Sequence, residues 1–211
     1  MRRVAVTGGV ATGKSTVLAA LSKLGVPTID LDEICRRLVE PGRPELARIQ
    51  AEFGSEFVRA GRLDRPRLRD LISREVGARA HLNAILHPPA VAEMERRLAE
   101  LAAAGHPLAA VEVPLLFEAG YADLFDAVIV AACPPELALA RLAERSSLGP
   151  AEAQRLMAAQ LPLEQKMARA DFVVDTAGSR KDVAAQVEQI LQRLQGAPPR
   201  QSRPEGGGQK A

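Results

Sequence analysis

A glycine-rich stretch near the start of the chain has the residue types that bind phosphate groups. Its residues, called the phosphate loop below, are Gly8, Gly9, Val10, Ala11, Thr12, Gly13, Lys14, Ser15 and Thr16. The glycines allow backbone angles at which consecutive N–H groups converge on one anion. An apolar run, residues 4–7, precedes the loop and a helix-favouring run, residues 17–21, follows it. The positive end of a helix dipole would add to the attraction, so we expect a nucleoside triphosphate here.

The spacing G-x-x-x-x-G-K-S in this context identifies a Walker A motif. We expect Lys14 to reach the β- and γ-phosphates and the Ser15 hydroxyl to hold Mg²⁺. The alternative, a turn that only joins a strand to a helix, does not account for a lysine and a hydroxyl at these positions. The sequence Asn-Lys-x-Asp, which recognises guanine in GTPases, is absent, so a guanine switch protein is not expected.

Composition limits the classes of partner. The chain of 211 residues suits one domain with an insertion, and it has no tryptophan and one tyrosine, which argues against stacking platforms for single-stranded nucleic acid. The formal net charge of +2 comes from residues 197–211, so we expect no nucleic-acid partner.

Cys35 and Cys133 lack metal-ligand spacing and are expected to be reduced. With no signal peptide and no run of membrane-spanning length, we expect a cytoplasmic protein with no membrane partner.

Five apolar runs predict a parallel sheet, with helical spacing between them. The runs cover residues 4–7, 26–30, 107–116, 125–132 and 172–174. This alternation predicts an α/β protein with the three-layer P-loop NTPase fold and a five-stranded parallel sheet. Ligands bind at the carboxyl edge of such sheets, so Asp32, just after the second run, is expected on the same rim as the phosphate loop.

Two helical stretches are expected to complete a single kinase domain over residues 1–196. Residues 34–101 lack a comparable strand signal and are too long for an ordinary connection, so we predict an inserted helical subdomain that binds the second substrate. Residues 136–167, an arginine-studded helical pair, are predicted to be a lid. Residues 197–211, rich in proline and glycine, are predicted to be a disordered tail. An apolar stripe in the last helix is expected in the core: Val183, Val187, Ile190, Leu191 and Leu194.

Several segments, in order and spacing, resemble dephospho-coenzyme A kinases. They are residues 7–15, 29–32, 39–42, 63–65, 86–88 and 113–118, with Gln160 and Lys166. Asp-x-Asp, His-Pro and Pro-Leu-Leu-Phe-Glu in this order are more selective than the Walker A motif alone. The resemblance covers residues 3–195 and implies ATP-dependent, Mg²⁺-assisted phosphorylation of the ribose 3′-hydroxyl of dephospho-coenzyme A (dephospho-CoA), the last step of coenzyme A synthesis.

The resemblance also implies roles for single residues. The catalytic residues are expected to be Asp32, Lys14, Arg141 and Arg145, and the acceptor contacts Asp32, His87, Leu115 and Glu118. Asp32 is the implied general base, with a helix N-cap as the alternative. Arg141 and Arg145, one helical turn apart, are expected to neutralise triphosphate charge as the lid closes. Structural alternatives stay open for His87, expected beside Pro88 at a helix boundary, and for Glu118, as a helix cap.

Three positions depart from the family pattern. Ala11 stands where glycine is frequent, Ser146 where aspartate is usual and Thr176 where asparagine is usual. Ala11 places a methyl group beside the phosphates, and Thr176 leaves the adenine-side contacts open. Two other functions are considered: another P-loop small-molecule kinase, such as a nucleoside monophosphate kinase, and a non-catalytic ATP-binding regulator. The sequence does not predict the oligomeric state.

Overall fold

The computed structural model describes residues 1–146 and 149–196. The chain divides into two compact units, of which the second contains Asp30–Glu100. The first unit contains Met1–Ile29 and the chain from Leu101 onward. The predicted tail, residues 197–211, lies outside the described residues.

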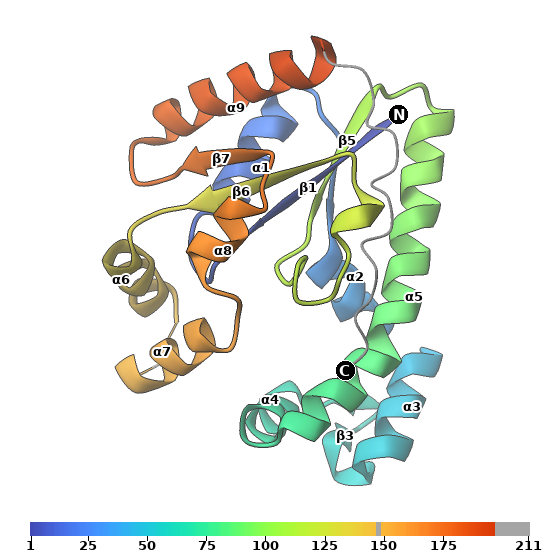
Figure 1. Ribbon diagram of the computed structural model, residues 1–211. Coiled ribbons are helices and arrows are strands. Elements are labelled where there is room, and N and C mark those ends of the chain that lie inside the picture. Colours follow the sequence, from blue (N-terminus) through green and yellow to red (C-terminus); the bar gives the residue numbers. More distant parts are fainter. Residues whose placement is uncertain (147–148, 197–211) are drawn as a thin grey trace, which may run out of the picture. The chain divides into compact units, whose positions relative to one another are not determined.

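A five-stranded parallel sheet forms the centre of the first unit (Figure 1). In spatial order its strands are β2 (Thr28–Asp30), β5 (Leu108–Glu112), β1 (Arg2–Gly8), β6 (Ala127–Ala132) and β7 (Phe172–Asp175). On the central strand, Val4 lies opposite Ala110 of β5 and Ala127 of β6. All five predicted strands are present. The third is shorter than predicted and ends before Pro114, which cannot donate to a strand ladder.

Both faces of the sheet are covered. Ile129 and Ala131 of β6 belong to a core formed with α1 (Lys14–Lys23) and α9 (Arg180–Gly196). Val128 and Val130 point to the opposite face and are also buried. The predicted apolar stripe of α9 is confirmed, because all its members are buried: Val183, Val187, Ile190, Leu191 and Leu194. Burial on both faces explains why the strands are continuously apolar.

The carboxyl ends of β1 and β6 lead into the phosphate loop and into a run of helices. β1 leads into the phosphate loop, and β6 leads into α6 (Pro135–Arg145). The chain continues through α7 (Pro150–Ala158) and α8 (Leu163–Ala168), and α8 packs near β6. The short 3₁₀ helix η2 (Ala122–Leu124) precedes β6. Parallel strands end at one edge, so the phosphate loop and the residues after β6 and β7 share that edge.

The second unit is mainly helical. Its elements are α2 (Leu31–Leu38), α3 (Pro44–Phe53), η1 (Ser55–Phe57), β3 (Val58–Arg59), β4 (Arg62–Leu63), α4 (Arg65–Arg74) and α5 (Val76–Ala103), whose last turn belongs to the first unit. Val39, Ile49, Phe57 and Leu68 form its core. The sequence did not predict the β3–β4 hairpin, because strands of two residues are too short to show an alternating pattern.

The prediction of a helix boundary at His87 and Pro88 is wrong. α5 continues through Pro88 and Pro89, and its ribbon changes direction part-way along (Figure 1). A proline inside a helix removes a backbone hydrogen bond and clashes with the preceding turn, and a bend relieves the clash without ending the helix. Neither α5 nor any other helix in the described ranges is long and apolar enough to cross a membrane.

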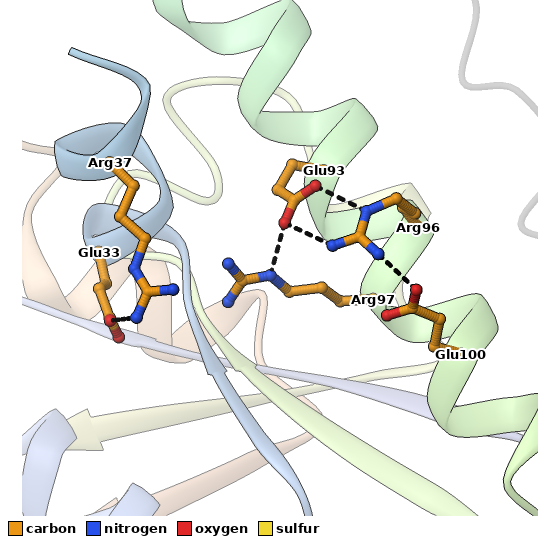
Figure 2. Close-up of polar contacts among 6 residues, drawn as sticks. All are labelled: Glu33, Arg37, Glu93, Arg96, Arg97 and Glu100. Carbon is orange, nitrogen blue, oxygen red and sulfur yellow. Dashed lines mark hydrogen bonds and ion pairs between the residues drawn. The ribbon is translucent and has the colours of Figure 1, made fainter. Parts of the chain in front are cut away.

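Charged side chains on α5 are paired with one another. Figure 2 shows Glu93 accepting hydrogen bonds from Arg96 and Arg97, while Arg96 also contacts Glu100. The two guanidinium groups lower the pKa of Glu93 to about 2. These arginines are neutralised by neighbouring carboxylates, so they are poor candidates for binding a phosphorylated ligand.

Candidate active site

The backbone of the phosphate loop is shaped by residues with positive φ. Gly8 has a φ of 152° and Gly13 has a φ of 86°. A Cβ atom on Gly8 would lie 2.4 Å from the carbonyl oxygen of Ala131. Ala11 has a φ of 57°, a left-handed conformation that costs a residue with a side chain about 1–2 kcal/mol. The loop therefore requires glycine at Gly8 and carries strain at Ala11.

Side chains of the loop fold back onto its own backbone. The Gly9 carbonyl accepts a hydrogen bond of 2.8 Å from Lys14 Nζ and one of 3.0 Å from Thr12 Oγ1. α1 begins at Lys14, and Ser15 is exposed in its first turn. The Thr16 N–H donates to the carbonyl oxygen of the N-cap Gly13 at 2.9 Å, and the positive end of the helix dipole lies at this turn. An ammonium group, a hydroxyl and the positive end of a helix thus meet at one place, which suits the phosphates of a nucleotide.

Arg141 of α6 reaches the residue that follows β7. Its Nη2 donates to the carbonyl oxygen of Thr176 at 2.6 Å, and its Nη1 donates to Thr176 Oγ1 at 3.2 Å. Arg145, the last residue of α6, is exposed. Arg141 and Arg145 therefore have different surroundings, because Arg141 is hydrogen-bonded at the carboxyl edge of the sheet and Arg145 is exposed.

Lys166 of α8 is fully buried, with 0% of its surface exposed. Its Nζ lies 2.8 Å from Glu118 Oε1. It also donates to the carbonyl oxygens of Gly8 at 3.3 Å and Pro114 at 3.2 Å, and to Gln160 Oε1 at 3.3 Å. Because a buried charge is tolerated only when it is paired and hydrogen-bonded, these contacts fix the start of the phosphate loop relative to the segment after β5.

Glu118 completes this arrangement. Burial tends to raise the pKa of its carboxyl group, but hydrogen bonds from Lys166 and from the Leu161 N–H outweigh burial and hold the pKa below its ordinary value. Glu118 is thus a carboxylate that is ion-paired and hydrogen-bonded within the protein. Its predicted contact with the acceptor stays a prediction, and the Lys166 pair was missed because no local pattern joins residues so far apart in sequence.

Asp32 lies in the second unit, on the first turn of α2, and is exposed. The N-cap of α2 is Asp30, whose Oδ1 accepts from the Glu33 N–H at 3.0 Å. The cap alternative for Asp32 is therefore excluded. Burial, followed by the charges of Asp32 and Asp30, raises the pKa of Cys35 to about 11, so this thiol stays protonated.

The other two predicted acceptor residues lie in different units. His87 is half-buried in α5, and burial lowers its pKa, which favours the neutral imidazole. Leu115 is half-buried in the segment after β5, where its carbonyl oxygen accepts from the Ala119 N–H at 2.9 Å. Their predicted contacts with an acceptor stay predictions.

Comparison with known proteins assigns the family. The dephospho-CoA kinase family model matches residues 2–182. A dephospho-CoA kinase of Anaeromyxobacter dehalogenans is 46% identical over 197 residues, which are 93% of each chain. The chain belongs to the dephospho-CoA kinase family.

Two solved structures are similar to this chain in sequence and in fold. A Thermus thermophilus protein is 33% identical with a TM-score of 0.79, and a dephospho-CoA kinase from Campylobacter jejuni is 27% identical with a TM-score of 0.68. Each alignment covers 92% of this chain and 98% of the other. The family confirms the predicted P-loop α/β fold, the kinase class and ATP as phosphoryl donor.

The structure shows the surroundings of the three departures from the family pattern. Ala11, where the family often has glycine, is the loop residue with left-handed backbone angles. Thr176, where the family usually has asparagine, is 2% exposed and faces the phosphate loop. Ser146 follows α6 and donates to the carbonyl oxygen of Leu142 at 2.6 Å. The first two departures therefore affect the loop itself.

The strain at Ala11 predicts that Ala11→Gly is tolerated or stabilising. Relief of about 1–2 kcal/mol is offset by the greater flexibility of glycine in the unfolded chain, about 0.4–1 kcal/mol, so we expect a gain of up to about 1.6 kcal/mol in unfolding free energy. The matched control is Ala19→Gly, at an exposed position of α1, which should lose about 1 kcal/mol. Urea denaturation measures both. Equal losses in the two variants would contradict strain at Ala11.

The Glu118–Lys166 pair predicts a stability that depends on pH. Since folding lowers the pKa of Glu118 from 4.5, the pair stabilises the folded state above the ordinary carboxyl pKa, and this stabilisation is lost as pH falls through the folded-state pKa. The unfolding free energy of Glu118→Gln should therefore fall furthest below wild type at neutral pH and approach it in acid. Glu164→Gln, at an exposed position of α8, should show a small difference at every pH. Denaturation between pH 3 and 7 tests this, and a pH-independent gap for Glu118→Gln would refute it.

Proposed function

We propose that the protein transfers the γ-phosphoryl group of ATP to the ribose 3′-hydroxyl of dephospho-CoA, giving coenzyme A and ADP. The observation that carries the proposal is a complete Walker A loop in a chain that a dephospho-CoA kinase family model matches over residues 2–182. Lys14 lies at the N-terminus of α1, where its charge can follow the γ-phosphoryl group during transfer.

Mg²⁺ fits the donor set at this loop. Among the described residues there is no group of three or more His, Cys, Asp or Glu side chains that could hold a metal. Mg²⁺ does not need such a cage, because it is usually bound through substrate phosphates, waters and a few protein oxygens. Ser15 would supply a hydroxyl ligand. When bound there, Mg²⁺ would supply positive charge that offsets the negative charge of the phosphates.

Asp32 is the general base in this proposal. It follows the end of β2 by two residues, and the carboxyl ends of parallel strands lie at the edge where ligands bind. The exclusion of the cap role supports a functional one. The transition state of phosphoryl transfer is loose, so Asp32 would orient the hydroxyl as well as accept its proton.

The remaining predicted residues have supporting roles. Arg141 and Arg145 would stabilise charge on the equatorial oxygens of the γ-phosphoryl group as the stretch 136–167 closes as a lid. His87, Leu115 and Glu118 would contact the acceptor. We propose that residues 34–101 bind dephospho-CoA as an inserted subdomain.

Acceptor selectivity tests the function. Purified protein with MgATP should form ADP when dephospho-CoA is added, and the product should have the mass of coenzyme A. Adenosine monophosphate and cytidine monophosphate serve as control acceptors. Stimulation by these nucleotides in place of dephospho-CoA would indicate a nucleoside monophosphate kinase, and nucleotide binding without transfer to any acceptor would indicate a regulator.

The general-base assignment predicts the behaviour of Asp32→Asn. The substitution keeps the shape of the side chain and removes its basic oxygen, so single-turnover transfer should slow by about 10²–10⁴-fold while both substrates still bind. Asp30→Asn is the matched control, because asparagine caps a helix about as well as aspartate, and its rate should stay near wild type. Rapid-quench transfer from labelled ATP measures both. A near-normal rate for Asp32→Asn would end the assignment.

A further inference from the structure

Thr176 is a buried polar residue that the mechanism above does not use. It directly follows β7 and is 2% exposed. Its N–H donates to the carbonyl oxygen of Ala132 at 2.8 Å, which fixes its backbone beside the end of β6. Its hydroxyl oxygen lies 2.7 Å from the carbonyl oxygen of Thr12 in the phosphate loop and 3.1 Å from that of Ala132.

The Thr176 hydroxyl has a single proton, so it can donate only one hydrogen bond, and the neighbouring groups determine which atom accepts it. Arg141 Nη1 lies 3.2 Å from Thr176 Oγ1, and a guanidinium group can only donate. Oγ1 therefore accepts from Arg141, and its own proton is donated to a carbonyl oxygen. The Thr12 oxygen, at 2.7 Å, is the nearer of the two acceptors.

This hydrogen bond sets the orientation of one peptide of the phosphate loop. The Thr12–Gly13 peptide is planar and trans, so its C=O and N–H point in opposite directions. With the C=O held by Thr176, the Gly13 N–H points away from Thr176. Gly13 cannot carry a side chain here, because a Cβ atom would lie 2.9 Å from Thr176 Oγ1. The close approach and the hydrogen bond therefore hold this peptide in one orientation.

We propose that Thr176 is a positioning residue for nucleotide binding. Its hydroxyl holds the Thr12 carbonyl outward so that the Gly13 N–H is presented to the phosphates, and the same residue holds Arg141 beside the loop. The phosphate loop and α6 are thus joined through the end of β7. The proposal rests on the proposed function only in taking a nucleoside triphosphate as the ligand.

A pair of substitutions separates the hydroxyl from the shape of the side chain. Thr176→Val keeps the branched shape and removes the hydroxyl, whereas Thr176→Ser keeps the hydroxyl and removes a methyl group. Affinities for MgADP and MgATP are measured by isothermal titration calorimetry, and the melting temperature without ligand is measured alongside. We expect Thr176→Val to weaken both affinities about tenfold, as the loss of one hydrogen bond implies. Thr176→Ser should stay close to wild type.

A purely structural role predicts a different result. Thr176→Val would then melt earlier but bind MgADP with wild-type affinity at temperatures where it is folded, and this outcome would overturn the proposal. Equal weakening by the serine variant would also overturn it, because the hydroxyl would not be the cause.

The link to Arg141 has its own test. Arg141→Ala should weaken MgATP binding less in the Thr176→Val background than in wild type, since residues in one hydrogen-bond network are not additive. Strict additivity would overturn this part of the proposal. MgADP binding needs no acceptor, so failure here is distinguishable from failure of the dephospho-CoA assay.

Discussion

The buried ammonium group of Lys166 is the constraint on which the nucleotide-binding edge depends. Removing a charge from water is costly unless its partners replace the lost hydration, and Lys166 meets Glu118, Gln160 and the carbonyl oxygens of Gly8 and Pro114. Those partners come from the end of β1, the segment after β5 and the chain before α8. They must converge for the cation to be buried, so the positions of these segments are interdependent.

The general organisation of the first unit could be predicted from sequence because it depends on local patterns. Continuous apolar runs predicted all five strands, and the 3.6-residue stripe predicted the buried face of α9. The Walker A spacing predicted a strand, a loop and a helix, because the glycines at positions 8 and 13 allow the positive φ angles that the loop adopts. Such features follow from residues near one another in the chain.

Other features could not be predicted because they depend on distant residues or on a balance of small terms. Nothing local to Lys166 indicates that its partners are Glu118 and two carbonyl oxygens. The departure at Thr176 was visible in the sequence, but its contact with Thr12 required the order of the strands. Proline usually ends a helix, yet α5 continues through Pro88 and Pro89, because a bent helix can accommodate proline in its interior.

The hydrogen bond between Thr176 and Thr12 joins residues separated by 164 positions, and the contact between Lys166 and Gly8 spans 158. The phosphate loop is synthesised before the residues that hold its backbone, because Lys166 and Thr176 lie much later in the chain. Contacts this distant in sequence form slowly and late. A nascent chain that ends before β7 would therefore contain the whole Walker A sequence without the hydrogen bond that orients its Thr12–Gly13 peptide, and full nucleotide affinity would arise only after Thr176 has been synthesised.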